Sequence, residues 1–176
     1  MKTEEPQTMS KEQLIKLLIQ HRPWESEPNN VRFKALGYDC EIKRHPELLH
    51  LCGYITMYKT HPLFVVEEGE MDHFIGMHGG VTYDKKRRST RTLGFDCAHA
   101  EDFSPGTFMA LAYIRMRDGE RVRDAMDELC FLNPPENYKT VKWVADQLTS
   151  VAMTLKTHEI EYDAERLTNV REAREV

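Results

Sequence analysis

The first half of the chain alternates hydrophobic and polar residues with the period of two that is typical of β-strands. Residues 34–44 place Tyr38, Cys40 and Ile42 on one face and charged side chains on the other. Residues 51–58 repeat this alternation after a break at a proline. The pattern predicts two neighbouring, half-buried strands.

Two further runs, 74–83 and 92–99, are rich in β-branched and aromatic residues and flank a short, strongly basic segment at 84–91. This arrangement predicts an antiparallel pair of strands joined by an exposed loop. Glycines interrupt both runs, at positions 76, 79, 80 and 94. Because glycine inside a strand marks a bulge or a close approach of the backbone to a ligand, we expect the functional site here.

The remaining hydrophobic patterns have the spacing of α-helices. A helix is predicted over 10–21, where a serine and a glutamine three residues later form a capping box, and further helices over 107–117 and 120–132. Residues 138–155 form the strongest helical pattern, with a continuous apolar face. The last residues, 156–176, are highly charged and either extend this helix or are loose.

Together these elements predict a single α+β domain over residues 1–155, followed by the charged extension 156–176. Its core is a mostly antiparallel sheet of about four strands within 36–99. Helices flank the sheet on its N-terminal and C-terminal sides, the latter within 104–155, and pack on one face. The apolar face of the last helix exceeds what one small sheet needs, so we expect a homo-oligomer.

Composition and charge limit the classes of function. Of 176 residues, 40% are hydrophobic and 30% are charged, which is ordinary for a soluble globular protein. The 24 basic and 29 acidic residues give a net charge of −5, which argues against a protein that coats long nucleic acids but not against a small anionic ligand. The sequence shows neither a membrane-spanning run nor the apolar core of a signal peptide, so we expect a cytoplasmic protein.

Chemically active side chains concentrate in and just after the central pair of runs. The basic segment 84–91 offers lysines and arginines to a phosphate, and charge-assisted bonds to phosphate are stronger than neutral ones. Tyr54, Tyr83 and Phe95 are candidates for stacking on a base. A cation cluster in a hairpin is also typical of a solvated tip that deters edge-to-edge pairing. The predicted ligand-binding residues are His78, Gly79, Gly80, Thr82, Arg91, Asp96, His99 and Asp102.

Two enzymatic interpretations remain open. In the first, a hydrolase uses His78, Asp96 and His99 as an acid–base set, or a zinc or manganese ion bound by residues of the group His78, Asp96, His99 and Asp102. Regular alternation places Asp96 and His99 on opposite faces, whereas His99 and Asp102, three residues apart, could share an ion or a proton. In the second, Cys97 is a nucleophile with a histidine as its base, whereas the simpler interpretation buries its thiol. Asp102 is also a candidate cap for the following helix. The binding interpretation requires no catalytic residue, metal or cofactor.

Five short blocks follow one another in the middle of the chain: Gly37–Cys40, Leu51–Ile55, His61–Leu63, Met77–Tyr83 and Gly94–Asp102. They resemble a family of small bacteriophage proteins that carry Cys-Gly-Tyr-Val, His-Pro, His-Gly-Gly-Leu-Thr and Gly-Phe-Asp-Cys-Ala-His-x-x-Asp motifs. The resemblance implies a phage protein in the cytoplasm of an infected bacterium. Several small phage proteins counter host defence there by sequestering nucleotide signals.

We therefore expect a phage accessory protein that binds and sequesters a small, phosphorylated, nucleotide-like signal of host immunity. Residues 85–91 are expected to close over a pocket lined by 78–82 and 96–102. The alternatives are a hydrolase of a phosphorylated small molecule and an inhibitor that blocks a host protein by contact through its exposed loops.

Overall fold

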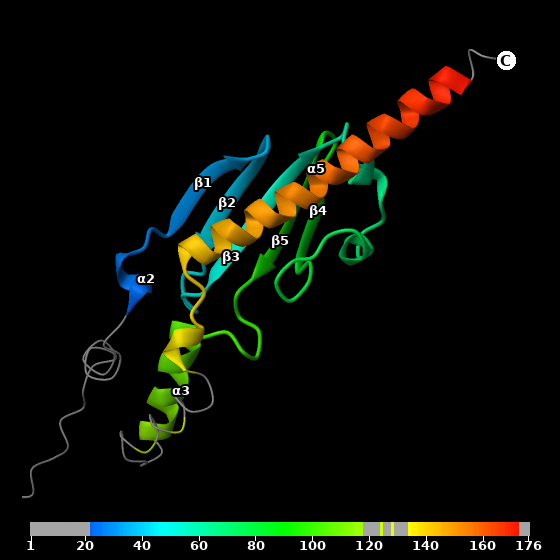
Figure 1. Ribbon diagram of the computed structural model, residues 1–176. Coiled ribbons are helices and arrows are strands. Elements are labelled where there is room, and N and C mark those ends of the chain that lie inside the picture. The colour runs from blue at the N-terminus through cyan, green and yellow to red at the C-terminus, as the bar shows by residue number, and fades with distance from the viewer. Residues whose placement is uncertain (1–21, 118–123, 125–127, 129–133, 173–176) are drawn as a thin grey trace, which may run out of the picture.

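Five antiparallel strands form the centre of the fold, and one long helix crosses one face of their sheet (Figure 1). The computed structural model describes residues 22–117, 124, 128 and 134–172. The strand order is β1-β2-β3-β5-β4, so the α+β class is as predicted, with a slightly larger sheet. In chain order the elements are α2 (Pro23–Ser26), β1 (Asn30–Ala35), β2 (Tyr38–Arg44), β3 (Leu51–Tyr58), η1 (Pro62–Val65), η2 (Met71–His73), β4 (Tyr83–Lys86), β5 (Thr90–Asp96), α3 (Pro105–Arg117), η3 (Pro135–Asn137) and α5 (Val141–Glu172).

Residues 30–44 form a hairpin rather than the single strand predicted over 34–44. β1 pairs with β2 so that Ala35 lies opposite Tyr38. Between them, Leu36 and Gly37 have φ values of 50° and 96°. Two positive φ values are typical of the tight turns that match strand twist. The sequence did not indicate this turn because a bulky residue such as leucine seldom adopts a left-handed conformation.

The strand predicted over residues 51–58 is confirmed as β3, which lies between β2 and β5. Two glycines let aromatic rings lie over the middle of the sheet, one ring on each face. A Cβ atom at Gly53 would lie 2.8 Å from the Phe95 ring, and one at Gly94 would lie 2.6 Å from the Tyr54 ring. Phe95 therefore packs under α5, whereas Tyr54 lies on the opposite face, which we call the open face.

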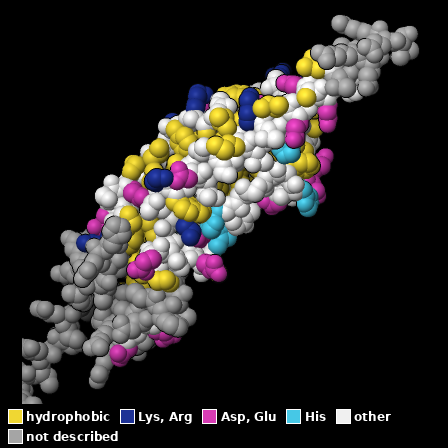
Figure 2. All heavy atoms as spheres, viewed as in Figure 1, with side chains coloured by type: hydrophobic (Ala, Val, Ile, Leu, Met, Phe, Trp, Pro, Cys, Tyr) yellow, Lys and Arg dark blue, Asp and Glu magenta, His cyan; other side chains and the backbone are white. Residues whose placement is uncertain are grey.

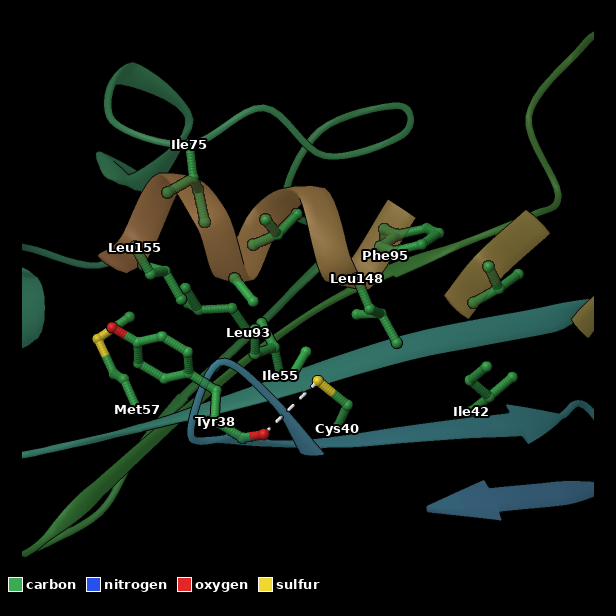
Figure 3. Close-up of a cluster of buried hydrophobic side chains, with 14 of the residues drawn as sticks. Tyr38, Cys40, Ile42, Ile55, Met57, Ile75, Leu93, Phe95, Leu148 and Leu155 are labelled. Atoms are coloured by element: carbon green, nitrogen blue, oxygen red, sulfur yellow. Dashed lines mark hydrogen bonds between the residues drawn. The ribbon is translucent and has the colours of Figure 1, made fainter. Parts of the chain in front are cut away.

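α5 packs its apolar side on the sheet and forms the main hydrophobic core with it (Figure 3). Leu148 and Leu155 point from the helix toward the strands, and Cys40 and Ile55 point back toward it (Figure 3). Burying each leucine contributes roughly 1.5–3 kcal/mol. The sheet therefore covers the apolar side of α5 within one chain. The homo-oligomer was predicted because this side was thought too large for the sheet to cover, and that reason no longer applies. The buried residues on the apolar side of α5 are Val144, Leu148, Val151, Ala152 and Leu155.

α5 continues to Glu172, so the charged extension is helical as far as the structure describes it. The C-terminal part of α5 runs past the edge of the sheet (Figure 1). Met153, Ile160 and Leu167 of α5 are more than half exposed, with relative exposures of 56%, 61% and 66%.

The run at 74–83, predicted to be a strand, is irregular until β4 begins at Tyr83. Gly79 and Gly80 have φ values of 66° and 93°, which lie in the left-handed region. Successive left-handed residues turn the chain and are incompatible with an extended strand. The density of β-branched and aromatic residues suggested a strand, but the two glycines decide the conformation.

Residues 84–91 belong largely to the β4–β5 hairpin, in which only 87–89 lie between the strands, rather than to one exposed loop. Arg91 is fully buried, and its guanidinium donates to both carboxylate oxygens of Asp84, at 2.8 and 2.6 Å. It also donates to the carbonyls of Val66 and Glu67, at 2.5 and 3.2 Å. Arg91 therefore anchors the segment after η1 to the sheet, and its predicted place in the ligand pocket was wrong.

The helix favoured over 107–117 is confirmed as α3, which begins beside the turn between β2 and β3 (Figure 1). There the Gly106 N–H donates to the Leu48 carbonyl at 2.8 Å. The predicted helices over 10–21 and 120–132 lie outside the described residues, apart from positions 124 and 128. Among the helices that the structure describes, none is long and apolar enough to cross a membrane.

Candidate functional site

One carboxylate oxygen of Asp102 is hydrogen-bonded to two histidine rings. Its Oδ2 atom lies 2.7 Å from Nε2 of His78 and 3.2 Å from Nδ1 of His99. The two rings are nearly perpendicular, with centroids 4.9 Å apart. We call this set of three residues the His–Asp–His centre. It joins two segments of the chain that no single strand or helix connects.

The turn after β5 positions two of these residues. Cys97 still pairs its N–H with the Leu51 carbonyl, at 2.9 Å, and the chain then leaves the sheet. The Asp102 N–H donates to the His99 carbonyl at 2.9 Å, and Asp102 Oδ2 accepts from the His99 N–H at 3.1 Å. Because an aspartate side chain can close a turn in this way, the sequence His-x-x-Asp holds both side chains in fixed relation.

Gly79 makes room for the second imidazole. A Cβ atom at this position would lie 1.9 Å from Nε2 of His99, and the φ of 66° independently favours glycine. His78 is supported on its other side by Trp143 of α5, whose ring centroid is 4.9 Å away. The centre therefore lies on the helix-covered side of the sheet, near Phe95.

The electrostatics of the centre favour a charged carboxylate. Burial raises the pKa of Asp102, but hydrogen bonds from His78 and from the His99 N–H outweigh burial and hold it below its ordinary value. The Lys139 ammonium group lies 3.5 Å from Oδ1. The Asp102 side chain is 1% exposed, whereas those of His78 and His99 are 23% and 31% exposed. Solvent therefore reaches the imidazoles but not the carboxylate, an arrangement suited to proton transfer or to holding a cation.

A hollow of about 500 Å³ lies on the open face of the sheet. Tyr54 and Tyr83 form part of its wall, with ring centroids 5.3 Å apart and nearly perpendicular planes. Thr56 and Thr92 lie opposite each other on β3 and β5, and their hydroxyl groups are 2.9 Å apart. The residues that line it are Arg32, Phe33, Asp39, Cys40, Glu41, Lys43, Tyr54, Thr56, Tyr83, Arg87, Thr90 and Thr92.

Charged groups at one side of this hollow form a linked set. Arg32 and Lys43 both pair with the Glu41 carboxylate, at 2.7 and 2.8 Å. Burial alone would raise the pKa of Glu41, but its bonds to these cations lower it to about 2. Arg87 is exposed at the hairpin tip and forms no ion pair with any residue in the described part of the chain. Lys43 also lies 5.7 Å from the centre of the Tyr54 ring.

The predicted ligand-binding residues separate into groups. His78, Gly79, Gly80, His99 and Asp102 lie at or beside the His–Asp–His centre. Thr82 and Asp96 instead line a second hollow of about 360 Å³, which shares Tyr54 and Tyr83 with the larger one. The two sets are apart because strand alternation continues through Asp96, and the chain turns only after Cys97. The set His78, Asp96 and His99, expected for a hydrolase, is therefore not assembled; Asp102 is the carboxylate between the histidines.

Cys97 is buried, with 2% of its surface exposed. Burial is the largest cause that raises the pKa of its thiol above the ordinary value, and nearby carboxylates raise it further. A thiol that stays protonated in a packed core is a poor nucleophile. The interpretation of Cys97 as a nucleophile was therefore wrong, and the simpler interpretation holds.

Sequence reasoning missed the contributions of Lys139 and Trp143 to the centre. They lie about 40 positions after His99, and nothing in their local pattern indicates that Lys139, just before α5, lies beside Asp102 or that Trp143 of α5 lies beside His78. It also missed Arg32, because β1 was not predicted, and Lys43, which lies on the charged face of the predicted strand and was given no role there. No protein-family model, curated protein or solved structure matches the chain.

Proposed function

We propose that the open face binds a small phosphorylated, nucleotide-like ligand and sequesters it. The observation that carries this proposal is the combination of Arg32, Lys43 and Arg87 with Tyr54 and Tyr83 around one hollow. Pockets for small molecules generally measure about 300–1,000 Å³, and this hollow, at about 500 Å³, lies within that range.

The cations provide for the phosphate. Arg87 is exposed and has no ion-pair partner among the described residues, so its guanidinium is available for a bidentate contact. Arg32 of β1 and Lys43 of β2 both pair with Glu41 of β2, so they lose little conformational freedom on binding. A phosphate at the rim of the hollow therefore meets positive charge from β1, from β2 and from the β4–β5 hairpin.

The tyrosines provide for a base. Stacking of a base on an aromatic side chain contributes roughly 1–3 kcal/mol. Tyr83 is 39% exposed, and Tyr54 is held by the sheet because its ring lies over Gly94. Burial raises the pKa of Tyr54 to about 12, so its hydroxyl remains a donor at neutral pH.

The lining of the larger hollow favours binding of a ligand without its chemical conversion. The described residues that line the larger hollow include no histidine, and the His–Asp–His centre lies on the other side of the sheet. A stable complex that returns its ligand unchanged suits sequestration. The resemblance to phage proteins suggests the context: removal of a host immune signal in the cytoplasm of an infected bacterium.

A thermal-shift screen against cyclic nucleotides and adenosine diphosphate ribose derivatives tests this proposal. We expect at least one compound to raise the melting temperature, to be recovered unchanged after heat denaturation, and to bind more weakly to R87E. R88E is the matched control, because Arg88 is exposed on the same hairpin tip but does not line the hollow. Equal loss of binding in both variants, or recovery of a cleaved product, would contradict the proposal. Absence of any shift would favour an inhibitor that acts by protein contact.

We further propose that a second copy of this chain packs on the exposed side of α5 that carries Met153, Ile160 and Leu167. Met153, Ile160 and Leu167 are spaced by seven residues, the repeat of a two-helix coiled coil. Lys156 and Glu161 flank this row at positions that face each other across a parallel pair, with opposite charges.

A further inference from the structure

We propose that His78, His99 and Asp102 bind a divalent transition-metal ion of the zinc class. Each residue offers one ligand atom, and the three atoms lie within 4.8 Å of one another. The site lies across the sheet from the hollow on the open face, so this inference does not depend on the ligand proposed there.

The spacing of the atoms suits a tetrahedral ion. Ligand atoms about 2.0–2.1 Å from zinc are separated from each other by roughly 3.3 Å in a tetrahedron. In the structure Asp102 Oδ2 lies 2.7 Å from the His78 nitrogen and 3.2 Å from the His99 nitrogen. An ion could therefore replace the shared hydrogens after small outward movements of the rings.

The ligand types and their exposure also fit. Two imidazoles and one carboxylate suit zinc, manganese or iron(II) rather than calcium or magnesium, which prefer oxygen ligands. Because the rings of His78 and His99 are partly exposed, a fourth position remains open to water. Three protein ligands with one open position are typical of a catalytic rather than a structural zinc site.

The surroundings hold the ligands in place. The His99 N–H donates to the Asp102 carboxylate, Gly79 leaves space for the His99 ring, and Trp143 packs against His78. Support of this kind is what orients ligands in metal sites, and its loss typically costs about 10–100-fold in affinity. The Lys139 ammonium group lies 3.5 Å from Oδ1 of Asp102. Its positive charge repels a bound cation and so limits the affinity of the site for the metal ion.

The test uses untagged full-length protein, stripped with a chelator and titrated with Zn²⁺ by calorimetry and with Co²⁺ by visible absorption. We expect one ion per chain, and quenching of tryptophan fluorescence by Co²⁺, because Trp143 touches the His78 ring. D102N and H99Q should weaken binding by more than about 100-fold, beyond the loss typical of a supporting residue. H73Q is the control, since the His73 side chain is 74% exposed and pairs with Glu70 away from the centre.

The proposal would be overturned by no stoichiometric binding to the wild-type protein, or by an equal loss of binding in H73Q and H99Q. Circular dichroism and thermal melting establish that each variant is folded. If H99Q or D102N does not fold, the wild-type protein still decides the question. Tetrahedral Co²⁺ absorption that Zn²⁺ displaces supports the site, and octahedral absorption like that of free Co²⁺ refutes it.

Discussion

His78 and Asp102 are 24 positions apart, yet their side chains are joined by a 2.7 Å hydrogen bond. The bond ties the loop before β4 to the turn after β5, at the end of the sheet where α5 begins. Asp102 is therefore both the residue that closes the turn after β5 and the carboxylate of the His–Asp–His centre. Substitutions around it separate these roles.

Asp102→Asn should lower the free energy of unfolding at pH 7 by about 1.5–3 kcal/mol, the range for a hydrogen bond to a charged group. The pKa of Asp102 is held below its ordinary value of 3.8. Its charge therefore contributes stability that is present above that value and is lost as the pH falls toward the folded-state pKa. Urea titrations between pH 7 and pH 3 should show the difference between wild type and variant shrinking in acid. The exposed Glu101→Gln serves as the control, and a gap that stays constant with pH would contradict this account.

Gly79→Ala should destabilise the protein more than Gly37→Ala. Both glycines have positive φ, but a Cβ at 37 meets nothing within 4 Å, whereas one at 79 would strike the His99 ring. The left-handed conformation alone costs alanine roughly 1–2 kcal/mol. The additional loss of unfolding free energy in Gly79→Ala over Gly37→Ala, measured by urea unfolding, is the cost of displacing the His99 ring. Equal losses at the two positions would mean that the ring moves aside freely.

Arg91→Met should cost about 3–5 kcal/mol, because it leaves the Asp84 carboxylate without its buried partner. Arg88→Met, at the exposed tip of the same hairpin, should change the free energy of unfolding by less than about 0.5 kcal/mol. Neither substitution removes a residue that lines the larger hollow, so nucleotide binding by folded protein should persist. A mild effect at Arg91 would show that the segment after η1 is held by other contacts.

Tyr83→Ala should weaken binding of a nucleotide-like ligand by roughly 5- to 150-fold, which corresponds to the 1–3 kcal/mol of base stacking. Tyr83→Phe keeps the ring and should bind nearly as well as wild type. Calorimetric titration with the compound that raises the melting temperature most provides the measurement. If the phenylalanine variant loses as much as the alanine variant, the hydroxyl rather than the ring makes the contact.

The double variant I160E/L167E should convert a dimer into a monomer in light-scattering measurements of molar mass. Two carboxylates in a row that packs against its own copy would repel each other and resist burial. Tyr162→Glu is the matched control, because Tyr162 is exposed on α5 outside the seven-residue row. A wild-type protein that is monomeric at high concentration would end the proposal of a second copy.

Local pattern was enough for β3 and for the buried side of α5. Leu51, Ile55 and Leu148 lie in runs whose period matches their element, and each is fully buried in the structure. The same reasoning misplaced Arg91, because a cation beside other cations usually indicates a solvated tip. Only the neighbouring strand, which supplies Asp84, and the η1 segment, which supplies carbonyls, make its burial possible.

The sequence by itself determined the α+β class, the strand β3, the helix α5 and the short stretch of chain that carries the His–Asp–His centre. Only the tertiary structure decided which carboxylate joins the histidines. Alternation along β5 directs Asp96 to the open face, and the turn after Cys97 brings Asp102 back toward His78. The physical reason is that period and propensity act over a few residues, whereas the position of a side chain at the end of a strand depends on distant segments. Here these are α5 and the loop before β4, whose packing no local pattern encodes.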